Sequence, residues 1–377
     1  KRLLFRPSVL IVTALALIAV ASTRSLWIGD GVLQGGALLP IQPGATGVWD
    51  AYLRAWHDVG PGSAVPAPPY LVLIGSFATV LFGNSNAAIT IVMLLGVPIA
   101  GLSAYVAARR LVPGRYIRAW MAAAYALLPA LTVATDQGRI GTVLAAIALP
   151  FAVRAFAEIS LPTGSTRSTA VAALLGAIVL ASTPTIWLAG CVAAVGAGLI
   201  QIVREGRRGV VICFRLLMAV AVPLLVLMPW SGYLMTNPRL LLLEPGWNSA
   251  NLIDPDLGAL DILLLHPSVS AASHVWFTAG IVVAALLTLA RRDTRPVVLA
   301  WWAVGLVAFV IAVGQSALAV SWAQTDANQA PWPGPATLLL GMIMIIICGV
   351  GAHGLRERFG DTSFTFGQPI AAAAALT

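Results

Sequence analysis

The stretch that decides the fold is Ala87–Ala108, which reads AAITIVMLLGVPIAGLSAYVAA and is followed at once by Arg109 and Arg110. It carries no charge and is long enough to cross the roughly 30 Å hydrocarbon core of a bilayer as a helix. Further apolar runs of this kind occur along the chain. Including Ala87–Ala108, the ten runs in chain order are Ser8–Thr23, Ala87–Ala108, Ala119–Thr135, Ile140–Glu158, Thr169–Ser182, Thr185–Val203, Val210–Trp230, Val275–Ala290, Pro296–Gly314 and Pro335–Leu355. These runs predict an all-α, polytopic integral membrane protein with about ten transmembrane helices.

The composition excludes the other broad classes of protein. Of the 377 residues, 59% are hydrophobic and only 10% are charged, against about 25% charged in a soluble domain. A soluble domain cannot hide that much apolar surface, and a disordered chain needs the opposite balance. The three cysteines lie inside apolar runs without metal-ligand spacing, and the histidines form no HExxH motif.

The basic residues predict the orientation of the helices. If the short run Pro69–Phe82 is a re-entrant or interface-lying helix, 18 of the 22 basic residues face the cytoplasm, as the positive-inside rule requires. The chain is then a multi-pass protein of the plasma membrane with a cytoplasmic N-terminus and long outer loops at 24–68 and 231–274. The basic surplus therefore indicates orientation and contact with anionic membrane lipids, and no nucleic-acid partner is inferred.

The chain is expected to be part of a longer protein. It begins with Lys1, and Ala371–Ala375 resembles the start of another apolar segment. We therefore divide it into a polytopic membrane domain at 1–358 and the start of a further segment at 359–377.

The first outer loop contains the candidate catalytic residues. A short helix over residues 48–58 would place Asp50, Arg54 and His57 on one face, with Asp58 at its edge. Its aromatic residues, Trp49, Tyr52 and Trp56, would form a neighbouring strip. In one interpretation Asp50 and Arg54 are an ion pair and the aromatic residues are an interfacial belt. In the other, Asp50 or Asp58 is a general base, with His57 beside it, and the rings stack on a sugar.

Two other polar segments face outward in this topology. The turn between the third and fourth runs contains Asp136 and Arg139; Arg139 could hold a phosphate or could pair with Asp136. In the second loop, Asp254 and Asp256 match the D-x-D pattern with which many glycosyltransferases hold a divalent metal and a diphosphate. A three-residue pattern often arises by chance, so the sequence establishes no cofactor. The cofactor that this pattern suggests is a divalent metal.

Three groups of residues resemble a known family. The first is Trp49–Gly60 with Val65–Tyr70, the second is Ala123–Pro129 with Gly138–Gly141, and the third is Leu263–Pro267. Together they resemble the membrane region of large actinobacterial family-2 glycosyltransferases. That region is similar to the GT-C class, which includes the mycobacterial arabinofuranosyltransferases.

The resemblance implies an enzyme of cell-envelope polysaccharide assembly, with interface-lying helices in its first outer loop. Its partners would be a polyprenyl-phosphate-linked sugar donor, a polysaccharide acceptor and a cytoplasmic family-2 glycosyltransferase domain in the uncut chain. Asp50 or Asp58 would deprotonate the acceptor, and Arg139 would face the lipid phosphate. The alternatives are a non-catalytic membrane module that anchors that domain or handles lipid-linked sugar for it, and a transporter.

Overall fold

The computed structural model describes residues 13–17, 33, 37–38, 44–57, 62, 64–161, 164–245, 257–268, 275–318, 320–322, 325–329 and 331–358. The α-helices with assigned bounds are α2 (Ala45–Leu53), α3 (Tyr70–Val80), α4 (Ser85–Ala107), α5 (Arg115–Ala126), α6 (Pro129–Asp136), α7 (Ile140–Ile159), α8 (Thr166–Ser182), α9 (Pro184–Glu205), α10 (Arg207–Val226), α11 (Trp230–Thr236), α12 (Ala259–Leu263), α13 (Val275–Leu287), α14 (Arg295–Ala317) and α15 (Gly334–Arg358). Short 3-10 helices are η2 (Ala108–Arg110), η3 (Pro238–Leu242) and η5 (Thr288–Ala290).

The described residues form a helical bundle that fits a polytopic membrane protein. Six helices, α4, α7, α9, α10, α14 and α15, are long and apolar enough to cross a membrane, and the pair α5 and α6 would make a seventh span. The expected spans Thr169–Ser182 and Val275–Ala290 correspond to shorter apolar helices, α8 and α13 with η5. The first expected span lies outside the described residues except for residues 13–17. The described part of the chain therefore supports fewer full-length spans than the ten expected.

The expected span Ala119–Thr135 is broken in the middle. Helices α5 and α6 meet at an angle of 42°, and Leu128 between them has extended backbone angles, φ −58° and ψ 134°. The reason is Pro129, because the proline ring disfavours the helical conformation of the preceding residue. Pro129 itself begins α6, where the missing N–H costs nothing.

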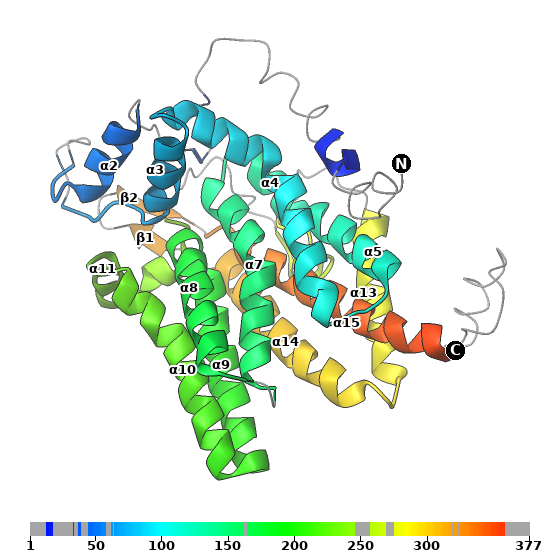
Figure 1. Cartoon of the computed structure of the whole chain (residues 1–377). Coiled ribbons are helices and arrows are strands. Elements are labelled where there is room, and N and C mark those ends of the chain that lie inside the picture. Colours follow the sequence, from blue (N-terminus) through cyan, green and yellow to red (C-terminus); the bar gives the residue numbers. More distant parts are fainter. Residues whose placement is uncertain are drawn as a thin grey trace.

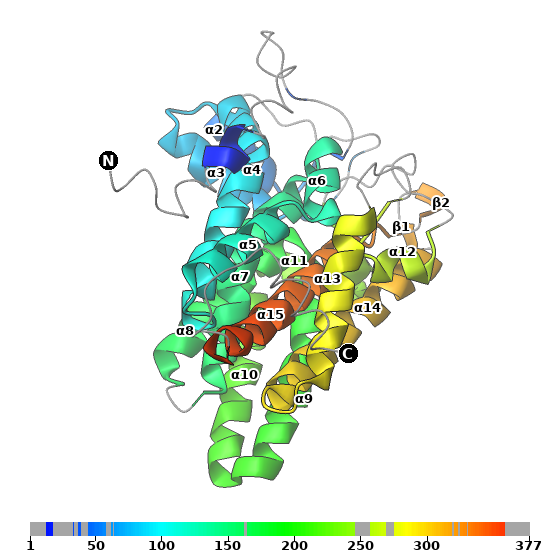
Figure 2. The same cartoon turned by 90° about the vertical axis from the view of Figure 1, so that its right-hand side faces the viewer.

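Helix α15 forms the centre of the bundle. Within Gly334–Ala352, 89% of the most apolar 18-residue stretch is buried. The helix contacts α14, α5, α13, α6, α9 and α7. In Figure 1 the other helices lie around it, and in Figure 2 it crosses the middle of the molecule between α5 and α13. Because α15 is the last described helix, the bundle core is completed only when the end of the described chain inserts between helices formed by earlier segments.

Arginine-rich turns gather at one end of the bundle. Arg110 Nη1 lies 2.8 Å from Glu158 Oε1, which joins the end of α4 to the end of α7. Arg291, after η5, donates a hydrogen bond to the carbonyl of Gly351 near the end of α15. Arg139 precedes the first residue of α7, at the opposite end of that helix. This grouping agrees with the expected sorting of charge, while the assignment of this end to the cytoplasm stays a prediction.

Helices α2 and α3 are packed on each other. Trp49 Nε1 donates to Thr79 Oγ1 over 3.2 Å, and its ring lies against Gly75, where an added Cβ would be 3.1 Å away. Helix α3 is 11 residues long, about 16 Å at 1.5 Å per residue, which is too short to cross a bilayer. This length agrees with a re-entrant or interface-lying helix at Pro69–Phe82.

A two-stranded hairpin connects α14 to α15. Strand β1 (Val320–Trp322) pairs antiparallel with β2 (Thr325–Gln329), with Val320 opposite Gln329 and Trp322 opposite Thr325. Figure 2 places it near α12. The sequence was expected to be all-α, so this hairpin is a small departure from that expectation.

Close packing of α7 against the end of α8 leads to a first prediction. A Cβ added at Gly141 would lie 2.6 Å from the carbonyl oxygen of Ser182, so Gly141→Ala must push the two helices apart. We expect a loss of about 1–3 kcal/mol of unfolding free energy, measured as reduced thermal stability of the purified protein in detergent. Gly314→Ala is the control, because nothing lies within 4 Å of its added Cβ. Equal stability of the two variants would contradict the predicted contact.

Candidate functional site

The centre of the candidate site is Arg139, whose charge is buried in an otherwise apolar bundle. Its side chain is 1% exposed. The turn that carries it depends on Gly138, which has a φ of 71°, a conformation that favours glycine. The turn is closed by a hydrogen bond from the Arg139 backbone N–H to the carbonyl of Ala134, 2.8 Å long. The guanidinium is thereby fixed at the start of α7.

Three side chains surround this guanidinium. Its Nη1 lies 2.7 Å from Glu244 Oε2, and its Nε donates to Gln137 Oε1 over 2.7 Å. Its Cζ is 4.1 Å from the ring centroid of Trp332, which is a cation–π contact in a desolvated setting. A buried guanidinium requires such partners, because an unpaired charge in a low-dielectric interior is very costly.

Glu244 comes from the loop that follows η3. Its side chain is 11% exposed, and its second carboxylate oxygen, Oε1, accepts a hydrogen bond from Thr142 Oγ1 on α7. The same carboxylate thus bridges Arg139 and Thr142. It holds the loop against the start of α7.

The preceding residues of this loop are held by two other helices. Gln315 on α14 is fully buried, and its Nε2 donates to the carbonyl of Leu242 over 2.7 Å. Thr185 on α9 donates to the carbonyl of Leu241 over 3.0 Å. Gln315 Nε2 also lies 3.3 Å from Thr185 Oγ1. The loop over residues 241–244 is therefore fixed by α7, α9 and α14 together.

The cluster retains hydrogen-bonding atoms that no described group satisfies. They are Arg139 Nη2, Trp332 Nε1, Gln315 Oε1 and Ser182 Oγ. All four side chains are buried, and leaving such an atom without a partner costs about 1–3 kcal/mol. Two of these atoms, Arg139 Nη2 and Trp332 Nε1, are hydrogen-bond donors at or beside the positive charge of Arg139. Such donors beside a guanidinium are suited to bind an anion.

The aspartate expected to pair with Arg139 does not do so. Asp136 ends α6 and is exposed, whereas Arg139 pairs with Glu244, which is 105 residues away in sequence. The Asp136–Arg139 ion pair is therefore wrong. The reason is that Gly138 turns the chain between the two residues and the buried carboxylate of Glu244 takes the guanidinium.

The helix expected over residues 48–58 is shorter than predicted. Helix α2 ends at Leu53, so His57 does not share a helical face with Asp50. Asp50 Oδ2 lies 3.7 Å from Arg54 Nη2, and both side chains are more than 60% exposed. The expected ion pair between these two residues is present, while a role of Asp50 as a general base stays a prediction. His57 is half-buried and its Nε2 has no hydrogen-bond partner among the described groups.

The three aromatic residues of this segment lie in different settings. Trp49 is used in the contact between α2 and α3, and Tyr52 packs against the main core. Trp56 is 55% exposed and lies against Gly62. Asp58, Asp254 and Asp256 lie outside the described residues. Within the part of the chain that is described, no group of three or more His, Cys, Asp and Glu residues could hold a metal ion.

The segment Leu263–Pro267 has a structural arrangement of its own. His266 Nε2 lies 3.0 Å from Thr278 Oγ1, and Asp261 Oδ2 accepts from the backbone N–H of Gly258 over 3.0 Å. Burial lowers the pKa of His266, and the nearby Asp261 carboxylate opposes that shift. The contact between His266 and Thr278 joins this segment to the start of α13.

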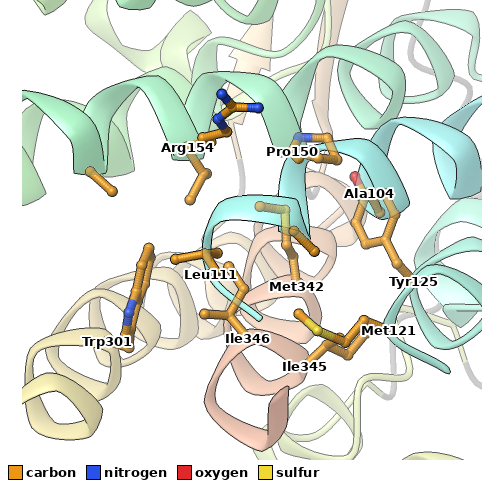
Figure 3. Close-up of a pocket in the computed structure, with 14 residues that line it drawn as sticks. Ala104, Leu111, Met121, Tyr125, Pro150, Arg154, Trp301, Met342, Ile345 and Ile346 are labelled. Atoms are coloured by element: carbon orange, nitrogen blue, oxygen red, sulfur yellow. The ribbon is translucent and has the colours of Figure 1, made fainter. Parts of the chain in front are cut away.

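A cavity at the other end of the bundle offers little for chemistry. It has a volume of about 30 Å³ and lies between α4, α5, α7, α14 and α15. Figure 3 shows Leu111, Met342, Ile346 and Trp301 among the apolar side chains that line it. Its charged residue, Arg154, donates to Glu158 over 2.8 Å. This cavity therefore presents an apolar surface with its charge already paired.

The sequence alone did not identify Glu244, Thr142, Trp332 and Gln315 as site residues. Weak signals were present: Glu244 is a lone acidic residue after four leucines, Trp332 lies between two prolines, and Gln315 interrupts an apolar span. Comparison with known proteins adds no family, because no protein family, curated protein or solved structure matches the chain.

The buried ion pair gives a second prediction. Removing one partner leaves the other charge buried and unpaired, so Arg139→Gln and Glu244→Gln should each cost about 3–5 kcal/mol of unfolding free energy. The double variant should cost clearly less than the sum of the two. Stability would be measured by denaturation of the purified protein in detergent.

The matched control for this cycle is Arg54→Gln, which breaks the exposed pair with Asp50 and should cost at most about 1 kcal/mol. If the Arg139 and Glu244 effects were as small as the control, or strictly additive, the two groups would not be a buried pair.

Proposed function

We propose that this chain is the membrane region of a glycosyltransferase in cell-envelope polysaccharide assembly, which takes its sugar from a polyprenyl phosphate at the outer face of the plasma membrane. The observation that supports it best is the buried Arg139 with its unpaired Nη2. A guanidinium matches the geometry of a phosphate better than an ammonium does. The resemblance of the first outer loop to the GT-C class gives the reaction type.

In this proposal the Glu244 carboxylate occupies the position that the phosphate takes when the donor binds. Exchange of one anion for another keeps the charge of Arg139 compensated throughout. The exchange requires the loop over residues 241–244 to move. Trp332 Nε1 would supply a second donor to a phosphate oxygen.

We propose the following reaction. The oxygen of an acceptor hydroxyl attacks the anomeric carbon, and the bond from that carbon to the phosphate oxygen breaks. The electron pair stays on the phosphate, where Arg139 stabilises the negative charge that develops. The proton of the hydroxyl passes to Asp50 or Asp58, with His57 close in sequence to assist.

A specific observation favours the second candidate, a non-catalytic module that handles lipid-linked sugar for a cytoplasmic glycosyltransferase domain. Asp50 is exposed and already paired with Arg54, which suits a surface ion pair as well as a base. In that case the phosphate site would remain and the carboxylates would be dispensable.

The phosphate site can be tested by binding alone. We expect farnesyl phosphate to bind the detergent-solubilised protein more tightly than farnesol, and Trp332→Phe to weaken only the phosphate ligand, by about tenfold. The ring and its contact with Arg139 survive this substitution. Microscale thermophoresis gives both affinities.

Trp302→Phe is the matched control for that measurement. Trp302 Nε1 is also buried without a described partner, but it lies about 20 Å along α14 from Gln315. Equal binding of farnesol and farnesyl phosphate, or equal effects of the two Trp→Phe variants, would remove Arg139 and Trp332 as a phosphate site.

Transfer activity distinguishes the enzyme from the handling module. Membranes that contain the full chain would be supplied with radiolabelled polyprenyl-phosphate sugars, and incorporation into polysaccharide would be measured. If Asp50 or Asp58 is the base, Asp50→Asn or Asp58→Asn should lower the rate by about 10²–10⁴-fold. Arg54→Gln, which removes the partner of Asp50 and keeps the carboxylate, should stay near the wild-type rate. Full activity in both Asn variants would favour the handling module.

A further inference from the structure

A second cavity opens on the side of the bundle, at its arginine-rich end. It lies between α5, α13 with η5, and α15, and has a volume of about 490 Å³. In Figure 2, α15 runs between α5 and α13, so the two outer helices form the walls and α15 forms the floor. We call this cavity the lateral groove. Its lining residues are Tyr116, Ile117, Trp120, Ala284, Leu287, Thr288, Arg291, Cys348, Gly351 and Ala352.

The floor of the lateral groove is made of small residues on α15. Cys348, Gly351 and Ala352 leave space there, whereas most of α15 is covered by other helices. Thr288 approaches so closely that a Cβ added at Gly351 would lie 2.5 Å from its Cγ2. The shape of the groove is therefore set by tight packing at its edge.

The interior of the lateral groove suits an apolar chain. Thr288 Oγ1 donates to the carbonyl of Ala285 over 2.6 Å, and Arg291 donates to the carbonyl of Gly351. These two polar side chains thus already make hydrogen bonds within the protein. Ile117, Ala284 and Leu287 supply apolar surface. A hydrocarbon chain fits these walls, and a polar ligand would lose its hydrogen bonds to water there.

The mouth of the lateral groove is basic. Arg291 lines the groove, Arg292 follows it in the turn, and Arg295 begins α14. On the opposite wall, Arg115 Cζ lies 5.0 Å from the ring centroid of Tyr116. Asp293 is the one acidic residue in these two segments, 115–120 and 291–295. Exposed Tyr116 and Trp120 at the wall are the residue types that lie at head-group depth.

These features point to one occupant. An apolar channel with a cationic mouth at head-group depth complements a lipid with a hydrocarbon chain and an anionic head. A second copy of the bundle or another apolar span of this chain would fill the channel but would leave the arginines without a counter-charge. We propose that the lateral groove binds an anionic phospholipid of the surrounding bilayer, with one acyl chain between α5 and α13 and its phosphate at the arginines. This proposal does not depend on the glycosyltransferase assignment.

The experiment uses the full chain in nanodiscs of phosphatidylcholine that contain a small fraction of phosphatidylglycerol with a diazirine in one acyl chain. After irradiation, mass spectrometry locates the labelled peptides. We expect labels on α5, α13 and α15 at the lateral groove. The same diazirine chain on phosphatidylcholine should label these peptides several-fold less.

Two tryptophan variants test the channel. Ala284→Trp places an indole in the lateral groove and should reduce labelling about tenfold. Val283→Trp is the control at the neighbouring position of α13. Val283 is 54% exposed, so this variant should leave labelling unchanged.

Two charge variants test the mouth. Arg115→Gln and Arg292→Gln should each lower the labelling by phosphatidylglycerol about fivefold, since each basic residue near an anionic membrane surface contributes on that scale. Arg291 is left intact because it also bonds the backbone of α15.

Several results would overturn the proposal. They are equal labelling by the two phospholipids, equal loss in Ala284→Trp and Val283→Trp, or no labelling of the wild-type groove peptides. Protein–protein cross-links at these peptides would show that a second copy covers the lateral groove instead. Displacement of the label by farnesyl phosphate but not by unlabelled phosphatidylglycerol would mean that the groove selects an isoprenoid chain.

Discussion

The arrangement at one end of this bundle depends on the burial of a single positive charge. Arg139 enters an apolar interior, so the fold must provide it with a carboxylate, a hydrogen-bond acceptor and an aromatic face. Each comes from a different part of the chain: Glu244 from the loop after η3, Gln137 from the turn before α7, and Trp332 from the segment before α15. The charge therefore fixes the relative positions of three distant segments.

The loop that carries Glu244 is the element on which the site converges. Its backbone carbonyls accept hydrogen bonds from Thr185 and Gln315, and its carboxylate bridges Arg139 and Thr142. Three helices, α7, α9 and α14, thus share one short segment. A carboxylate that is held in this way can be exchanged for another anion without leaving the guanidinium uncompensated, and this links the structural role of Arg139 to the proposed phosphate site.

The two ends of the bundle present different chemistry to a membrane. At one end, the charge of Arg139 is buried beside Glu244 and Trp332. At the other end, arginines lie in turns around apolar space, which includes the lateral groove between α5 and α13. Helix α15 joins the two ends: Trp332 precedes it, and Cys348, Gly351 and Ala352 form the floor of the lateral groove. Both proposed ligands have an anionic group and an apolar chain, as lipids do.

The sequence by itself determined the class of fold and the positions of the long helices. Helices α4, α7, α9, α10, α14 and α15 follow apolar runs that are readable in the sequence, because hydrophobicity and length are local properties. The helix break before Pro129 also has a local cause, the proline ring, although the continuous apolar run Ala119–Thr135 predicted a single span. Arg139 was identifiable because it is a lone cation beside an apolar span. Only the tertiary structure decided its partner: Glu244 lies 105 residues away, and nearby Asp136 was the obvious choice in sequence. The partner of a buried charge is set by which segments the packing of the helices brings together, and that depends on the whole bundle at once.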